Sequence, residues 1–202
     1  MPDEELFELA RKNELRKQLE PQVKRMLRDA RSAALVDNFA GQWLQIRNLD
    51  VVSPDKSIYP GADDALIKSM RRETELFVAH VIQEDRSVLE LIDADYSFLN
   101  GPLAKLYGID GVEGEKFQKV NFKDRRRGGL LGQASVLTIT SNPTRTSPVK
   151  RGKWVLDNLL GAPPPPPPPN VPELKAQDGK TLTGTLRQRM EQHREKIGRA
   201  HV

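Results

Sequence analysis

The chain has 202 residues, 37% of them hydrophobic and 30% charged, so it has room for one domain of moderate size or two small ones. Its 32 basic residues are nearly balanced by 28 acidic ones, which leaves a formal net charge of +4 and indicates a mixed, solvated surface, with nucleic acid not expected as a partner. No run approaches the roughly 20 apolar residues of a membrane-spanning helix. The first residues, MPDEE, lack the basic and apolar pattern of an export signal.

The N-terminal part predicts two helices. Residues 4–20 are dense in charge, and Pro21 is expected to interrupt the helix that they form. A second helix is expected over residues 23–29. We treat residues 1–21 as an incomplete N-terminal helical segment that lacks its partners.

Two core helices follow. Residues 33–49 carry apolar residues at helical spacing, namely Leu35, Phe39, Trp43 and Ile46 in one stripe with Val36, Ala40 and Leu44 alongside. Asp63 or Asp64 can cap the next helix, which is expected to reach about Gln83. Its apolar stripe consists of Leu66, Met70, Phe77 and Val81, with Ile67, Val78 and Ile82 beside it.

Shorter elements are predicted beyond residue 84. Asp85 is a candidate cap for a short helix near residues 88–92, and Asn100 for one that ends at Tyr107, where Gly108 stops it. Residues 117–122, FQKVNF, alternate as a short strand or an extended connection would.

Residues 146–161 carry strong helix signals. Ser147 is a hydroxyl N-cap directly before Pro148 at the first helical position, and Gly161 is placed to end the helix. Its apolar face is expected to contain Val149, Gly152, Leu156 and Leu160, with Val155 and Leu159 beside them, and Gly152 is expected to allow close approach of another element. The seven prolines of residues 163–169 would span about 22 Å as polyproline II and are typical of a spacer.

Long strings of the sequence resemble a known family. RGGLLGQASVLTITSNPTRTSPVKRGKWVLDNLLG followed by a proline run, and upstream LVDNFAGQWLQIRNLD, MRRETELF, EDRSVLELIDADYSFLN and LAKLYGI, are similar to two adjacent domains of unknown function in planctomycete-type cytochrome c-like multidomain proteins. The resemblance covers roughly residues 26–193. It implies a mostly α-helical chain, a helix through residues 134–136, and a large exported bacterial protein in which such domains accompany haem c.

The resemblance also implies a division of the chain. We expect a first, irregular helical domain over residues 22–124, and a smaller helical domain with the proline run over residues 125–174. A linker and terminal helix follow over residues 175–202. Residues 197–202, IGRAHV, match the translation of a sequencing adapter and are expected to be non-native. We therefore expect a fragment whose partners include missing N- and C-terminal domains of the same chain.

The most distinctive polar residues lie around the predicted helix start, and they are Asn142, Arg145, Thr146, Ser147, Lys150, Arg151 and Lys153. Cations in the first turns of a helix oppose its dipole. One explanation is a bound anion or a partner's carboxylate. The other is that Arg145 or Arg151 pairs with carboxylates of the preceding domain, for which the candidates are Glu73, Glu75, Asp93 and Asp95.

No catalytic constellation or metal site is predicted, and the chain has no cysteine to which haem c could attach. We expect no cofactor within these residues and haem c elsewhere in a periplasmic or extracellular full-length protein. The preferred function is a structural or docking portion that positions haem domains or a redox partner. One alternative is part of a c-haem oxidoreductase acting on an extracellular organic substrate, with Glu73, Asp95 and Arg145 lining its site. Another is a polyanion-binding helical protein.

Overall fold

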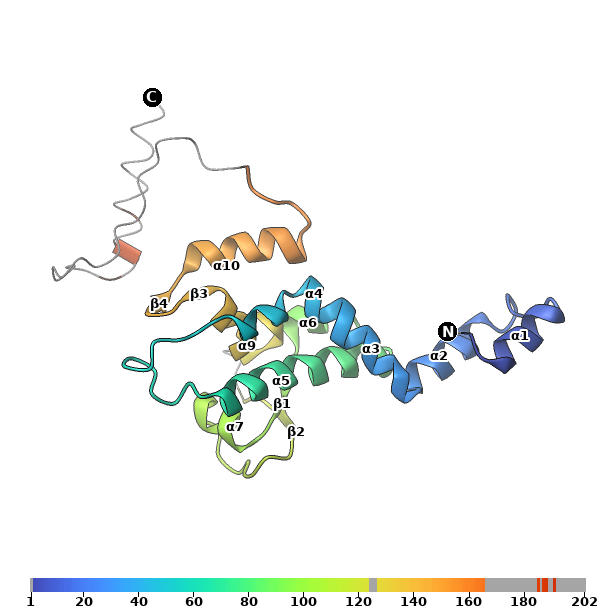
Figure 1. Ribbon diagram of the computed structural model, residues 1–202, viewed down its shortest axis with the longest axis horizontal. Coiled ribbons are helices and arrows are strands. Elements are labelled where there is room, and N and C mark those ends of the chain that lie inside the picture. Colours follow the sequence, from blue (N-terminus) through green and yellow to red (C-terminus); the bar gives the residue numbers. More distant parts are fainter. Residues whose placement is uncertain (1, 124–126, 166–184, 186, 189–190, 192–202) are drawn as a thin grey trace. The chain divides into compact units, whose positions relative to one another are not determined.

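The computed structural model describes residues 2–123, 127–165, 185, 187–188 and 191. Met1–Ala162 form one compact unit and Pro163–Val202 a second. The described part of the chain is mostly helical, as predicted, with two small antiparallel sheets of two strands each (Figure 1).

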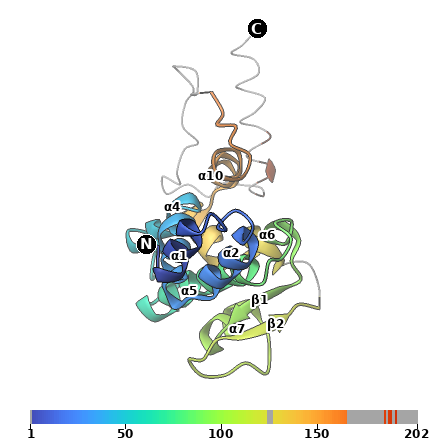
Figure 2. The ribbon, with the colours of Figure 1, turned by 90° about the vertical axis from the view of Figure 1, so that its right-hand side faces the viewer.

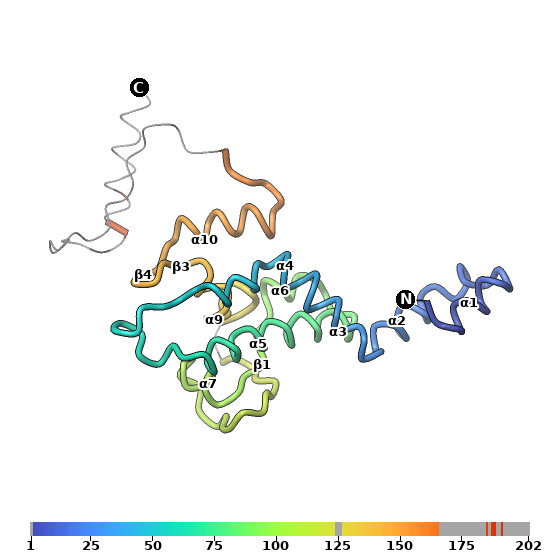
Figure 3. Tube along the Cα trace, in the orientation of Figure 1, coloured from blue at the N-terminus to red at the C-terminus, as the bar shows by residue number. Residues whose placement is uncertain are grey.

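The path of the chain can be followed in Figure 3. In order, it forms α1 (Glu4–Arg11), α2 (Leu19–Arg28), the 3-10 helix η1 (Ala30–Ser32), α3 (Ala33–Leu35), the π-helix η2 (Val36–Ala40), α4 (Gly41–Trp43), the 3-10 helix η3 (Ile46–Asp50), α5 (Asp64–Gln83), α6 (Glu90–Asp93) and β1 (Tyr96–Leu99). It continues with α7 (Gly101–Tyr107), β2 (Gln118–Asn121), α8 (Gly129–Gly132), α9 (Ala134–Ile139), β3 (Ser141–Asn142), β4 (Arg145–Thr146), α10 (Pro148–Trp154) and the π-helix η5 (Val155–Leu159).

The long helix α5 is the element around which the first unit is built. Asp63 caps it by accepting a hydrogen bond from Leu66 N at 2.8 Å, as predicted. The helix packs against β1, α7, α9 and η2 (Figures 1 and 2). Its buried apolar residues are Met70, Phe77, Val78 and Val81. The predicted core stripe is therefore largely confirmed.

The predicted helix over residues 33–49 ends earlier than expected, and two of its predicted core residues are exposed. Gln45 has a φ of 57°, a left-handed conformation that no α-helix can contain, so the helical run stops at Trp43. Val36, Ala40 and Leu44 are buried, whereas Leu35 and Phe39 are 42% and 55% exposed. Leu35 and Phe39 are thus wrong as core residues. The rest of the predicted apolar face is confirmed, because Ile46 is also buried and Trp43 packs against the core.

The prediction that Pro21 interrupts the N-terminal helix is wrong. Pro21 is the third residue of α2, in the first turn, where its missing N–H breaks no intrahelical hydrogen bond. The chain instead breaks after α1, where Asn13 has a φ of 55°.

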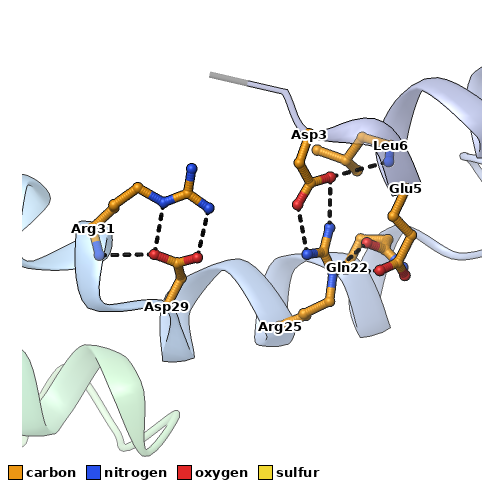
Figure 4. A network of polar contacts seen from close by, with 7 residues as sticks. All are labelled: Asp3, Glu5, Leu6, Gln22, Arg25, Asp29 and Arg31. Carbon is orange, nitrogen blue, oxygen red and sulfur yellow. Dashed lines mark hydrogen bonds and ion pairs between the residues drawn. The ribbon is translucent and has the colours of Figure 1, made fainter.

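Polar contacts hold α1 against α2 (Figure 4). Arg25 donates two hydrogen bonds to the Asp3 carboxylate, at 2.6 and 3.0 Å, and Gln22 donates to Glu5 at 2.6 Å. The hydrogen bonds from Arg25, followed by the one from Leu6 N, lower the pKa of Asp3 to about 2. Hydrogen bonds and an ion pair therefore connect the two helices.

The predicted strand is confirmed, and it has an unexpected partner. β2 pairs antiparallel with β1, with Tyr96 opposite Asn121. Asn100 caps α7 and Gly108 ends it in a left-handed conformation, as predicted. Asp85 is not a helix cap, because it adopts a φ of 50° in the turn after α5 and α6 begins only at Glu90.

Ser147 caps α10 as predicted, but the helix buries a different face. Trp154 is the residue of α10 that is buried, whereas Val149 and Leu160 are 58% and 65% exposed. Among the described residues, no atom lies within 4 Å of the position that a Cβ of Gly152 would take, so no described element makes the expected close approach there. Gly161 has the expected positive φ. Most of the proline run, and most of the linker and terminal helix predicted over residues 175–202, lie outside the described residues.

Candidate functional site

The predicted anion- or partner-binding residues lie on a hairpin and the helix that follows it. We call residues 142–153 the basic segment. β3 and β4 form the hairpin, with Asn142 opposite Arg145, and Asp55 N donates to Pro143 O at 3.0 Å. The Ser147 hydroxyl accepts from Lys150 N at 3.3 Å and starts α10. The hairpin pairing and the Ser147 cap therefore fix the backbone conformation of the basic segment.

The cations of the basic segment differ in their partners. Lys153 forms an ion pair with Asp157 at 2.5 Å, and Arg151 donates to the Thr140 hydroxyl at 3.3 Å. Within the part of the chain that the structure describes, no carboxylate lies within ion-pair distance of Arg145 or Lys150. Among the described residues, no ion pair joins Arg145 or Arg151 to Glu73, Glu75 or Asp95.

The four predicted carboxylates are not gathered into one site. Glu75 pairs with Arg72 at 3.0 Å, and Asp93 is the last residue of α6. Asp95 is exposed, and its backbone carbonyl accepts from Phe122 N at 2.6 Å. Glu73 is the exception, because it is fully buried on α5.

The Glu73 carboxyl group lies in a closed polar network. Ser97 Oγ donates to one oxygen and Tyr107 OH to the other, each at 2.7 Å. Burial raises the pKa of Glu73 to about 7, although these two hydrogen bonds act to lower it. Since Glu73 has no exposed surface, it cannot exchange a proton with a substrate, and its role in this conformation is structural.

Tyr107 extends the network to α9. Its hydroxyl accepts a hydrogen bond from Ala134 N at 2.7 Å, and the Arg127 guanidinium lies 4.5 Å from the centre of its ring. Burial, followed by the neighbouring Glu73, raises the pKa of Tyr107 well above its ordinary value. The hydroxyl is therefore protonated at any physiological pH and donates to Glu73.

A second buried network lies one residue along α5. Thr74 Oγ1 is 2.7 Å from Gln133 Oε1 and 2.6 Å from Ser135 Oγ. Gln133 is 1% exposed, and its Nε2 has no hydrogen-bond partner among the described residues.

Gly129, with a φ of 58°, lets α8 approach α6 so closely that a Cβ there would lie 2.3 Å from Ile92 O.

Two tryptophans complete the contacts between distant parts of the chain. Trp43 donates its indole N–H to Asn158 O at 2.6 Å, and Trp154 donates to Leu44 O at 3.2 Å. The sequence predicts Trp43 in a core stripe and predicts no role for Trp154. The available signal for Trp154 is an indole about two helical turns after the N-cap Ser147.

Family comparisons divide the chain into two matched segments. Residues 1–109 match PSD4, described as a protein of unknown function (DUF1592), which covers more than half of the chain. The chain belongs to the PSD4 family. Residues 127–199 match PSCyt3, described as a protein of unknown function (DUF1588). Both names denote planctomycete cytochrome c-like families, as the resemblance implied. Neither the curated proteins nor the solved structures include a significant match.

The contacts described above join the PSD4 segment to the PSCyt3 segment. Tyr107, Thr74 and Trp43 belong to the PSD4 segment, and their partners Ala134, Gln133 and Asn158 to the PSCyt3 segment. Buried residues of both segments form one hydrophobic core. Within the first unit, the PSD4 segment and residues 127–162 of the PSCyt3 segment therefore share one core.

The family names suggest haem c, and the residues of this chain do not fit its attachment. The sequence contains no cysteine, so no thioether bond to haem can form within it. In the part that the structure describes, no cluster of three or more histidine, cysteine, aspartate or glutamate side chains could hold a metal ion. No described helix is long and apolar enough to cross a bilayer.

Proposed function

We propose that this chain is a structural or docking part of a larger exported c-type-haem redox protein, in which it positions haem domains or a redox partner. The common core of the PSD4 and PSCyt3 segments carries this proposal. Within Met1–Ala162, buried hydrogen bonds and a continuous apolar core connect the two segments, and such a core gives the parts attached to it a firm support.

The basic segment is the proposed docking surface. Arg145 and Lys150 have no acidic partner among the described residues, and Lys150 is exposed. An acidic surface of a haem domain or redox partner would complement these charges. The residues expected to contribute are Asn142, Arg145, Thr146, Ser147, Lys150, Arg151 and Lys153.

The geometry favours this function over an oxidoreductase site. An enzyme of the expected kind would place a carboxylate with a raised pKa in a cleft beside Arg145. The carboxylate with the raised pKa is Glu73, and it is buried with Ser97 and Tyr107. Glu73 therefore has a structural role within the core.

The test uses the full-length protein and a lysine-reactive cross-linker, read by mass spectrometry. We expect a c-type haem absorbance spectrum, and cross-links from Lys150 to residues outside this chain. Arg145→Glu should reduce the yield of those cross-links several-fold, whereas Arg16→Glu, an exposed arginine between α1 and α2, should not.

The possible outcomes separate the parts of the proposal. Absence of c-type haem would overturn the redox assignment. Haem with cross-links from other surfaces only would overturn the basic segment as the docking site. Steeply salt-dependent binding of this chain to a DNA oligonucleotide would support the polyanion-binding alternative in its place.

A further inference from the structure

A cavity of about 240 Å³ lies between η2 and α5, well away in sequence from the basic segment. Its lining residues are Val36, Asp37, Ala40, Gly41, Ile46, Arg47, Arg71, Thr74 and Glu75. The volume is slightly below the range of about 300–1,000 Å³ that is typical of pockets for drug-sized ligands. The cavity is therefore of a size for a small metabolite.

The cavity has an apolar interior and a charged rim. Val36, Ala40 and Ile46 are each at most 5% exposed, whereas Asp37 and Arg47 are exposed. Two cations and two anions line the cavity, so their formal charges cancel. A ligand without net charge suits such a lining better than a net anion or cation.

Two of the four charges are already paired. Arg71 forms an ion pair with Asp50 at 2.5 Å, and Glu75 pairs with Arg72 at 3.0 Å. These pairs leave Asp37 and Arg47 as the charges that a ligand could engage.

Asp37 and Arg47 lie on the same rim, and they do not pair with each other. Arg47 donates to neutral oxygens only, to Asn38 Oδ1 at 3.0 Å and weakly to Asp37 O at 3.5 Å. No hydrogen bond or ion pair reaches the Asp37 carboxylate from any described residue. A guanidinium and a carboxylate thus flank one apolar cavity, each with donors or acceptors to spare.

The backbone around the cavity is irregular on both sides of these residues. Val36–Ala40 form a π-helix, a rare geometry that is frequent at functional sites, and Asp37 is its second residue. Gln45, two residues before Arg47, has a φ of 57°. A left-handed non-glycine residue is strained and typical of binding sites.

We propose that this cavity binds a small zwitterion with an aliphatic side chain, of the class of the aliphatic α-amino acids. Arg47 would bind the carboxylate, Asp37 the ammonium group, and Val36, Ala40 and Ile46 would contact the side chain. The proposal is independent of the docking function, because the cavity is lined by PSD4 residues alone.

The test is an NMR titration of this chain with L-leucine, with 3-methylbutylamine and 4-methylpentanoate as probes that each lack one of its charged groups. We expect leucine to shift the amide resonances of Asp37, Gly41 and Thr74 saturably. Each single-charge probe should bind at least about tenfold more weakly, because it lacks one of the two charge-assisted hydrogen bonds that leucine can form.

Charge-removing variants identify which residue binds which group. Arg47→Gln should abolish the preference for leucine over 3-methylbutylamine, and Asp37→Asn the preference for leucine over 4-methylpentanoate. The matched controls are Arg16→Gln and Asp110→Asn, which remove exposed charges outside the cavity lining. All four positions are exposed, so the variants should fold, and their melting curves verify this.

Three results would overturn the proposal. They are unchanged resonances of the lining residues at millimolar leucine, equal affinity for leucine and either single-charge probe, and unchanged leucine affinity in both Arg47→Gln and Asp37→Asn.

Discussion

Trp43 and Trp154 donate hydrogen bonds in opposite directions across one contact, the first to the carbonyl of Asn158 and the second to the carbonyl of Leu44. Leu44 directly follows Trp43, and Asn158, four residues after Trp154, donates its side-chain amide to the Trp154 carbonyl at 2.9 Å. The contact joins residues 110 or more positions apart in the sequence and connects the PSD4 and PSCyt3 segments.

Removal of the buried indole should destabilise both segments together. Trp154 is 4% exposed, so Trp154→Ala should lower the free energy of unfolding by about 3–5 kcal/mol through the cavity it leaves. Trp154→Phe should lower it less, by about 1–3 kcal/mol, mainly because Leu44 O loses its donor. Urea unfolding measures both, and Val149→Ala, at an exposed position of the same helix, is the control. Two separate transitions in the wild-type chain would contradict a common core.

Glu73 should make the protein less stable as the pH rises. Below about pH 4.5, the ordinary pKa of glutamate, the group is protonated in both states. Between that pH and about 7, the unfolded chain releases the proton and the folded chain keeps it, so the folded state binds more protons and the free energy of unfolding falls. The total loss is about 3 kcal/mol at pH 7 and above.

The variant Glu73→Gln isolates this effect. The unfolding free energies of the wild type and Glu73→Gln are measured in urea from pH 4.5 to 8. As the pH rises, the wild type should lose stability relative to the variant. Other titrating groups contribute equally to both proteins and cancel. A difference independent of pH would show that Glu73 ionises normally in the folded state.

The Tyr107 hydroxyl should matter more than its size suggests. Tyr107→Phe removes the donor to Glu73 and the acceptor of Ala134 N at once, which leaves two buried polar groups unpaired. An unpaired buried group costs about 1–3 kcal/mol, so a loss of about 2 kcal/mol or more in unfolding free energy is expected. The control is Tyr59→Phe, because Tyr59 is 41% exposed. Equal stability of the two variants would contradict a structural role for the Glu73–Tyr107 hydrogen bond.

Acid should release α1 from α2 before the rest of the first unit unfolds. The lowered pKa of Asp3 means that its contact with Arg25 stabilises the pair above about pH 3.8 and is lost as the pH falls through about 2. Asp3→Asn should give the same release at neutral pH. Hydrogen exchange of the Leu6 amide measures it, and that amide should exchange faster in Asp3→Asn than in the control Asp110→Asn. Unchanged protection of Leu6 would mean that other contacts hold α1.

Local signals in the sequence identified several elements and part of the candidate sites. The side chains of Asp63, Asn100 and Ser147 were recognised as helix caps, because a cap and the amides it satisfies lie within three residues of each other. The strand near residue 120 was recognised by its alternation. Glu73 is a candidate carboxylate from the sequence alone, yet Ser97 and Tyr107, which donate hydrogen bonds to it, come from elements that no local pattern connects to α5.

By itself, the sequence determined the family, the mostly helical class and the capped helices, since these depend on composition and short-range hydrogen bonding. The tertiary structure decided which of two apolar stripes is buried in residues 35–44, and that Trp154 lies in the core where Val149 does not. It also decided that Arg145 lacks an acidic partner among the described residues, and that Asp37 and Arg47 flank one cavity. The physical reason is that burial and charge pairing depend on which distant surfaces meet, and that follows from packing of the whole core.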